Sequence, residues 1–237
     1  MKYAIPAPTT PSIAIDGRHE RFPIRRIFCV GRNYAAHARE MGKDPDREPP
    51  FFFTKPADAV CDSSSIVPYP PLTDNLHHEV ELVVAIGQRA NRIKAEAARN
   101  AIWGYGVGID LTRRDLQLAA RDAGRPWDWG KAFDFSAPCG PLRPVATAGH
   151  IEAGPISLSV NGAARQNADL KDLIWSVPEI IAYCSAAVEL KPGDLIFTGT
   201  PAGVSSISPG DHLVGRITGL DDIAITISEA SSEQEEE

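Results

Sequence analysis

The segment NLHHEVELVVAIG, residues 75–87, constrains the fold of this chain more than any other. Its apolar, β-branched run LVVAI ends in a glycine, which is typical of a buried strand. Glu79 and Glu81 come directly before this run, and residues two positions apart in a strand point to the same face. Burying two unpaired carboxylates side by side is costly. The two glutamates must therefore lie on a wet edge of a sheet or beside a cation.

Short strand patterns bounded by glycine and proline recur through the chain, whereas helical patterns are few and short. The clearest strand patterns are RRIFCVG (25–31), FFFTKP (51–56) and GYGVGIDLT (104–112). The helical patterns cover residues 33–42, about 94–102, 113–124 and a segment with Pro178 in its first turn. Because strands and helices do not alternate regularly, the sequence favours a β-rich mixed α/β domain with a rolled sheet or barrel core over a doubly wound fold.

The two ends of the chain differ in composition from the middle. Residues 1–24 are rich in proline and contain the turn pair Asp16-Gly17 between alternating apolar residues, which predicts a small hairpin. The tail, residues 229–237, ends in SSEQEEE and is expected to be disordered. These shifts divide the chain into an N-terminal arm (1–24), a main domain (25–228) and an acidic tail (229–237).

The charge and cysteine pattern narrows the class of partner. The formal net charge is -7, the final SSEQEEE segment contributes four of the negative charges, and no Lys/Arg cluster is longer than two residues, which argues against nucleic acid as a partner. No segment approaches the roughly 20 apolar residues that span a bilayer. The four cysteines form no CxxC pair, which is typical of reduced thiols. We therefore expect a soluble, cytoplasmic protein that contacts neither nucleic acid nor a membrane.

A divalent cation between the two glutamates would need further oxygen ligands. Asp110 ends the apolar run GVGI and is a candidate third carboxylate, although an aspartate there is also an ordinary cap for the following helix. His77 would share the face of the glutamates if the strand extends that far, and His78 would face away. A histidine at such a place more often orients a carboxylate than binds the metal itself.

Two further groups have the chemistry of an active site. His37 and Glu40 are three residues apart in a helical pattern and share one face, so the carboxylate could fix the imidazole as a general base for water. The same spacing also describes a plain surface pair. Lys55 and Lys131 are each isolated in apolar surroundings, where a lysine either extends to water or stabilises negative charge. From residue chemistry alone, both interpretations remain open.

Eight ordered motifs, which span the chain from about residue 25 to 227, resemble the fumarylacetoacetate hydrolase family. They are GRNYAAHAREMG (31–42), FFFTKPADAV (51–60), LHHEVELVVAIG (76–87), GYGVGIDLTRRDLQ (104–117), GRPWDWGKAFDFSAPCGP (124–141), VNGAARQ (160–166), LIWSVPEIIAY (173–183) and LKPGDLIFTGTPAGV (190–204). The first and fifth motifs are most similar to family members that hydrolyse fumarylpyruvate.

The resemblance implies a mixed β-sandwich roll with few short helices, a homodimer, and a site for Mg²⁺ or Mn²⁺. By position, it implies Glu79, Glu81 and Asp110 as metal ligands. It also implies catalytic roles for three residues: His37 and Glu40 as a dyad that activates water on a lid helix, and Lys131 as a group that stabilises developing negative charge. Arg32, Lys55, Gln117 and Thr200 match positions that bind substrate.

The implied activity is hydrolysis of a carbon–carbon bond in a β-diketo acid, with fumarylpyruvate and water giving fumarate and pyruvate in the breakdown of aromatic compounds. The alternatives are oxaloacetate decarboxylation, isomerisation of an unsaturated oxo-diacid, and a non-catalytic scaffold stabilised by metal. A distal carboxylate on the substrate would need a cation. Four arginines are candidates, and the sequence does not choose among them: Arg32, Arg113, Arg114 and Arg125.

Overall fold

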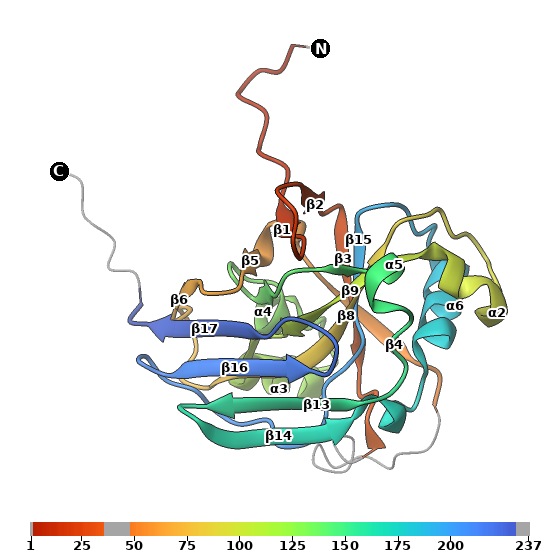
Figure 1. Cartoon of the computed structure of the whole chain (residues 1–237). Helices are drawn as coiled ribbons and strands as arrows, with labels where there is room; N and C mark the ends of the chain where they lie inside the picture. The colour runs from red at the N-terminus through yellow and green to blue at the C-terminus, as the bar shows by residue number, and fades with distance from the viewer. Residues whose placement is uncertain (1, 36–47, 231–237) are drawn as a thin grey trace.

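The computed structural model describes residues 2–35 and 48–230 of the 237-residue chain. Its body consists of two packed sheets with short helices around them, and the N-terminal segment projects from the top (Figure 1). The mixed, strand-rich fold expected from the sequence is confirmed. No helix within the described ranges is long and apolar enough to cross a membrane.

The larger sheet contains the strand that the sequence singled out. Its strands, in the order β4-β3-β15-β8-β9-β11-β5 with β12 paired to β9, are β4 (Phe51–Lys55), β3 (Arg26–Gly31), β15 (Asp194–Phe197), β8 (Val80–Ile86), β9 (Ile102–Ile109), β11 (Ala137–Cys139), β5 (Val60–Asp62) and β12 (Arg143–Pro144). The β15–β3 and β11–β5 pairs are parallel and the other pairs are antiparallel. The sheet is therefore mixed, as the roll predicts.

Strand β8 is buried along its whole length between β9 and β15. Leu82 and Val84 point into one apolar cluster, and Val83 and Ala85 point into another on the opposite face. This division explains why LVVAI is a continuous apolar run and not an alternating one, because both faces of the strand are covered. By the same alternation, Glu81 lies on the face of Val83 and Ala85.

The smaller sheet covers one face of the larger one. It has the order β14-β13-β16-β17-β6 and consists of β14 (Ala163–Asp169), β13 (Pro155–Val160), β16 (His212–Ile217), β17 (Ile223–Ser228) and β6 (Ile66–Pro68). Its inward side chains, such as Leu158, Leu213 and Ile225, belong to the same cluster as Leu82. In Figure 1 its four longer strands lie in front of β8 and β9.

The helices are short. They are α2 (Ala95–Ala98), α3 (Arg114–Asp122), α4 (Asp128–Lys131), α5 (Val145–Ala148) and α6 (Val177–Ala187), with 3₁₀ turns η1 (Ala57–Ala59), η2 (Arg99–Ala101) and η3 (Leu170–Asp172). The helix expected over about 94–102 is α2, which continues as the 3₁₀ turn η2 to Ala101 and ends there because Ile102 is buried and already pairs with Ile86 in the sheet. Pro178 lies in the first turn of α6, as predicted, next to a capping box formed by Ser176 and Glu179.

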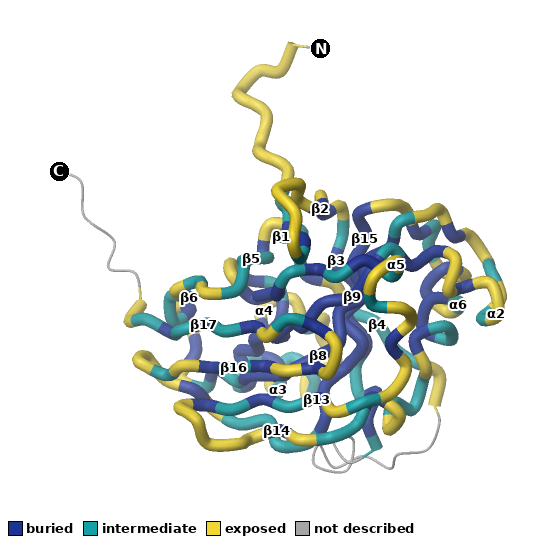
Figure 2. Tube along the Cα trace, viewed as in Figure 1, coloured by how far each residue is buried: buried dark blue, intermediate teal, exposed yellow. Residues whose placement is uncertain are grey.

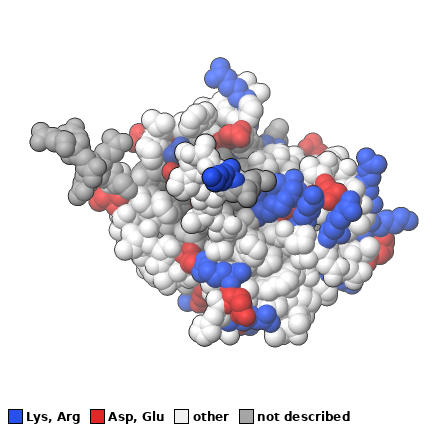
Figure 3. Space-filling view, turned by 90° about the horizontal axis from the view of Figure 1, so that it is seen from above, with Lys and Arg blue, Asp and Glu red and all other residues white. Residues whose placement is uncertain are grey.

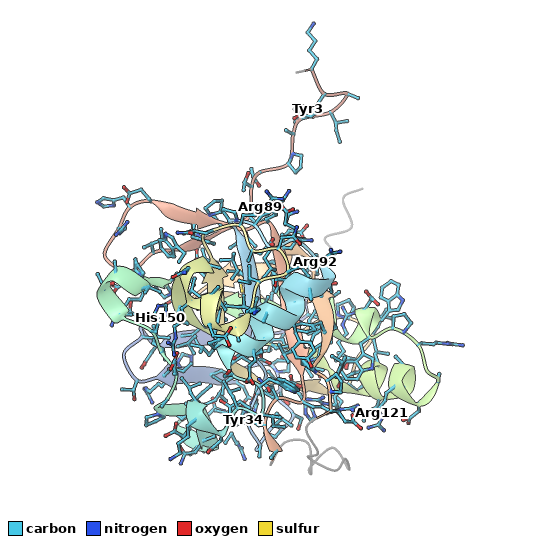
Figure 4. The ribbon with its side chains drawn as sticks, turned by 90° about the vertical axis from the view of Figure 1, so that its right-hand side faces the viewer. Tyr3, Tyr34, Arg89, Arg92, Arg121 and His150 are labelled. Carbon is cyan, nitrogen blue, oxygen red and sulfur yellow. The ribbon has the colours of Figure 1, made fainter. Side chains whose placement is uncertain are left out.

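The N-terminal region forms the predicted hairpin of β1 (Ser12–Ala14) and β2 (Arg21–Pro23), with its turn at 16–17. Ile13 and Phe22 from this hairpin are buried against the second cluster. Residues 2–10, by contrast, are exposed and extend away from the body (Figure 2), and Figure 4 shows Tyr3 near their far end.

Arg25 and Arg26 bind the buried Asp194 at the ends of two neighbouring strands. Their guanidinium groups lie 3.0 and 2.9 Å from its carboxylate oxygens, which ties the start of β3 to the start of β15. Seen from above, acidic and basic side chains lie close together on this face of the molecule (Figure 3).

Candidate active site

Three carboxylates meet where strands β8 and β9 lie side by side. Glu79 directly precedes β8, Glu81 lies within it, and Asp110 directly follows β9. Antiparallel pairing places Glu81 opposite Gly108 and brings the end of β9 beside the start of β8. One oxygen from each of the three carboxylates lies within 4.8 Å of the other two. We call these residues the carboxylate cluster.

The cluster is buried, which decides one question that the sequence left open. Glu79, Glu81 and Asp110 are only 5%, 2% and 0% exposed, so the glutamates do not lie on a wet edge. Burial, together with the neighbouring charges of Asp110 and Glu79, raises the pKa of Glu81 well above its usual value. Such a set of negative groups is stable only beside cations.

Two lysines and an arginine supply positive charge around the cluster. Lys131 Nζ lies 2.8 Å from Glu79 Oε2 and 2.7 Å from Asp110 Oδ2, and it also donates to Thr112 Oγ1 at 2.6 Å. Arg114 donates to Glu79 Oε1. Burial opposes the charge of Lys131, but Asp110 and Glu79 outweigh it and raise the lysine pKa above its ordinary value.

Lys55 lies behind Asp110. Its Nζ is 2.8 Å from Asp110 Oδ1 and donates to the backbone carbonyl oxygens of Leu111 and Lys131. The contact with Oδ1 is a buried ion pair, although its angles fall outside those of a hydrogen bond. Each carboxylate oxygen of Asp110 therefore has a lysine ammonium group beside it.

A backbone amide is a further partner of the cluster. Gly199 N–H donates to Glu81 Oε2 at 2.7 Å. Gly199 has φ = +100°, and a Cβ added there would lie 2.7 Å from the Cβ of Asn33. Only glycine fits this position without displacing Asn33, and so the TGTP turn brings its backbone against the carboxylate.

A buried glutamine holds the strand next to the cluster in place. Gln166, from β14, accepts from the Val80 N–H at 3.0 Å and donates to Thr200 Oγ1 at 2.8 Å and to the Pro201 carbonyl at 2.8 Å. Its Oε1 is also 3.0 Å from Nδ1 of His78, whose Nε2 is 3.0 Å from Ser205 Oγ. His78 faces away from the cluster, as expected.

His77 does not share a continuous strand with the glutamates, contrary to one sequence expectation. β7 (Leu76–His77) pairs with β10 (Thr112–Arg113), and β8 begins only at Val80. His78, which lies between the two strands, contacts Gln166 and Ser205. Burial, followed by the charge of Arg114, lowers the pKa of His77 to about 4, so its imidazole is neutral at neutral pH.

A hollow opens in front of the carboxylate cluster, and we call it the carboxylate hollow. Its lining residues are Val30, Gly31, Arg32, Phe53, Glu79, Glu81, Arg114, Gln117, Trp127, Lys131 and Thr200. The structure thus brings Arg32, Gln117, Thr200 and Lys131 to the cluster, whereas Lys55 is not among the lining residues. His37 and Glu40 lie outside the described residues.

Arg32, one of the lining residues, is held by identifiable contacts. Arg32 has φ = +57°, and its guanidinium lies 5.5 Å from the ring centre of Phe51 and 6.0 Å from that of Trp127. The next residue, Asn33, donates its side-chain amide to the Trp175 and Thr198 carbonyls, which anchors this segment.

Sequence reasoning missed Arg114 and Gln166 as structural partners of the site. Arg114 and Gln117 are three residues apart in α3, and Arg114 donates a hydrogen bond to Gln117 Oε1. Helical spacing could therefore have predicted that these two side chains are in contact. Gln166 contacts Val80 across 86 positions of sequence, and no local pattern reveals such a contact.

A buried Glu-Glu-Asp set at the edge of a hollow, on a mixed β-sandwich roll, defines a class of candidate metal-dependent enzymes. Residues 26–228 match the model of the fumarylacetoacetate (FAA) hydrolase C-terminal family, and the chain belongs to this family. This confirms the resemblance found in the sequence.

Individual relatives are similar over most of the chain. Fumarylpyruvate hydrolase from Ralstonia sp is 45% identical over 192 residues, which are 80% of this chain and 100% of that protein. A crystal structure of fumarylpyruvate hydrolase from Pseudomonas aeruginosa, in complex with Mn²⁺ and pyruvate, superposes with a TM-score of 0.95 at 50% identity and covers 96% of this chain and 100% of that one. Oxaloacetate tautomerase YcgM from Escherichia coli is 42% identical over 84% of this chain and 90% of its own length.

Proposed function

We propose that this protein is a metal-dependent hydrolase that cleaves the carbon–carbon bond of an acylpyruvate, with fumarylpyruvate as its substrate. The observation that carries the proposal is the buried carboxylate cluster facing a hollow. The similarity to fumarylpyruvate hydrolases, one of them in complex with Mn²⁺ and pyruvate, supports it. Such a reaction would serve the breakdown of aromatic compounds.

The residues present fit a divalent cation. Glu79, Glu81 and Asp110 offer hard oxygen donors, and one oxygen from each side chain lies within 4.8 Å of the other two. These three side chains would hold Mg²⁺ or Mn²⁺. When bound, the cation would supply Lewis-acid polarisation of the oxo acid.

The side chains in the carboxylate hollow suit the pyruvate half of the substrate. Gln117 accepts from Arg114 through Oε1, which leaves its amide N–H groups to donate to the substrate carboxylate. Arg32 lines the same hollow and adds a cationic donor. Thr200 already donates to the Val80 carbonyl at 2.9 Å, so we assign it to shaping this wall.

His37 and Glu40 would move the proton that the reaction requires. Water loses a proton to His37 as its oxygen bonds to the 4-oxo carbon. The adduct then breaks its C3–C4 bond, and the electron pair leaves with the pyruvate half as an enolate. The ammonium group of Lys131 would stabilise that charge. Protonation at C3 gives pyruvate, and the other fragment leaves as fumarate.

The direct test is to mix the purified protein with Mn²⁺ or Mg²⁺ and fumarylpyruvate, follow the loss of enol absorbance, and identify the products. The proposal predicts metal-dependent loss with equal amounts of fumarate and pyruvate. The absence of metal-dependent loss would contradict it.

Oxaloacetate chemistry is the second candidate, because oxaloacetate tautomerases are 42% and 39% identical to this chain. Tautomerisation or decarboxylation of oxaloacetate needs no attacking water. In a hydrolase, His37→Ala should lower kcat by about two orders of magnitude or more. If this variant keeps full activity on oxaloacetate, the water-independent candidate is favoured.

A homodimer in the cytoplasm completes the proposal. Trp129 and Leu72 are each 74% exposed and Phe135 is 43% exposed, and Trp129 and Phe135 line one surface hollow together with Pro71. An apolar surface of this kind suits an interface between two copies. The four free cysteines support a reducing compartment. Light scattering of the wild type and of Trp129→Glu would test the dimer, which the charge should weaken.

A further inference from the structure

A second hollow, of about 400 Å³, adjoins the carboxylate hollow. We call it the aromatic hollow, and its lining residues are Phe51, Phe52, Phe53, Thr54, Arg125, Pro126, Trp127, Asp128 and Lys131. Phe53, Trp127 and Lys131 line both hollows. The two hollows therefore adjoin at these three side chains.

The walls of the aromatic hollow suit a flat, conjugated chain. The ring centres of Phe51 and Trp127 are 4.9 Å apart, with the rings at 89° to each other. The ring of Phe53 lies 5.8 Å from that of Trp127. These rings present apolar surface between the cluster at one end and the charged residues of the 125–128 loop at the other.

Three of the four candidate arginines do not line the aromatic hollow. Arg114 donates hydrogen bonds to Glu79 and Gln117 at the cluster. Arg113 lies 4.4 Å from the ring centre of Phe133, and it lines the separate hollow of Trp129 and Phe135. Arg32 lines the carboxylate hollow and is not among the residues around the aromatic one.

Arg125 is both available and well positioned. It is exposed, and its guanidinium makes no hydrogen bond or ion pair with any residue that the structure describes. Its backbone is fixed by the end of α3, where Arg125 N–H donates to the Ala120 carbonyl at 2.8 Å and Gly124 N–H donates to the Arg121 carbonyl at 3.1 Å. With Gly124 at φ = +63°, these bonds form a Schellman cap, and Pro126 follows it.

We propose that Arg125 binds the distal carboxylate of the substrate and so selects dicarboxylic acylpyruvates over neutral ones. This inference rests on the proposed function. The pyruvate half would lie at the carboxylate cluster, the conjugated chain along Phe53 and Trp127, and the far carboxylate at the guanidinium of Arg125. A planar guanidinium with an unoccupied fork of N–H donors is suited to a carboxylate.

The test compares fumarylpyruvate with acetylpyruvate, which has the same dioxo acid but a methyl group in place of the distal acidic chain. The measured quantity is the ratio of kcat/KM for the two substrates with Mn²⁺-loaded protein. Arg125→Ala should lower this ratio by about tenfold or more, because a hydrogen-bonded charge pair to the substrate is lost. Arg125→Lys should restore part of it.

Arg121→Ala is the matched control. Arg121 lies on α3 near the surface (Figure 4), is ion-paired with Asp122 at 2.8 Å, and lines neither hollow. Its removal takes away the same charge and should leave the ratio within about twofold. A ratio unchanged in Arg125→Ala, or one that falls equally in Arg121→Ala, would overturn the inference.

A binding experiment separates failure of this inference from failure of the proposed function. If the wild type hydrolyses neither substrate, the proposed function fails, and calorimetric titration of both dioxo acids into the Mn²⁺-loaded protein still tests Arg125. Arg125→Ala should then weaken only fumarylpyruvate binding, by about tenfold or more. Equal binding of fumarylpyruvate to the wild type and this variant would overturn the role of Arg125.

Discussion

Replacing Gln166 with leucine should destabilise the protein strongly, although Gln166 does not line the carboxylate hollow. Its side chain is 1% exposed and makes contacts to four partners: Val80 N–H, His78 Nδ1, Thr200 Oγ1 and the Pro201 carbonyl. Leucine leaves two buried donors, on Val80 and His78, without an acceptor. An unsatisfied buried polar group costs about 1–3 kcal/mol, so we expect a loss of about 3–5 kcal/mol in the free energy of unfolding.

Thermal and urea unfolding measure this effect. For a chain of this size, about 2–4 °C is lost per kcal/mol, so Tm should fall by about 6–20 °C. Since Gln166 holds His78 and Val80, which lie on either side of Glu79, Mn²⁺ affinity should also fall by about tenfold.

Asn167→Leu provides the control, because Asn167 is the exposed neighbour of Gln166 in β14. It should change the free energy of unfolding by no more than about 0.5 kcal/mol. A loss below about 1 kcal/mol for Gln166→Leu, or an equal loss for Asn167→Leu, would refute the assignment of these hydrogen bonds as the support of the site.

The position of the carboxylates could be predicted in part from the sequence. Strand alternation places Glu79 and Glu81 close together on one face, and the apolar run beyond them correctly indicated a buried strand. Alternation within one strand does not identify the neighbouring strand, however. Asp110 could therefore be recognised only as a candidate until the β8–β9 pairing brought it to the glutamates.

The cations around the cluster were less predictable. Lys55 and Lys131 are both 3% exposed or less and ion-paired, whereas isolated lysines usually extend to water. Lys55 comes from β4, at the edge of the sheet order, and Lys131 from α4. Which of them would lie behind Asp110 and which would line the hollow depends on long-range packing that no local spacing encodes.

Three further changes probe the site from other directions. Gly199→Ala should cost about 2 kcal/mol or more in unfolding free energy, since φ = +100° disfavours a side chain and the new Cβ would meet Asn33. Urea unfolding measures this cost. An unchanged unfolding midpoint would contradict the close approach of Gly199 to Asn33. His77 has a folded pKa of about 4 against 6.5 in its unperturbed state, so the unfolded chain binds more protons between these values and stability should fall as pH decreases from about 6.5 to 4. His77→Asn should flatten that part of the stability profile, and an identical profile would exclude this origin. Mn²⁺ at about 100 times its Kd should raise the unfolding free energy by about 2.7 kcal/mol and therefore raise Tm, and a chelator should reverse that rise. If neither Mn²⁺ nor the chelator changes Tm, no cation binds the folded state selectively.

The central claim is that Glu79, Glu81 and Asp110 hold the divalent cation. The measurement that tests it most directly is a titration of the wild type and Glu81→Gln with Mn²⁺, in which the free ion is followed by electron paramagnetic resonance. Glutamine keeps the shape of the side chain and can still accept the Gly199 N–H bond, so the fold should persist. The account predicts one bound Mn²⁺ per wild-type chain and an affinity at least about tenfold weaker in the variant. Equal affinity in the two proteins would contradict it.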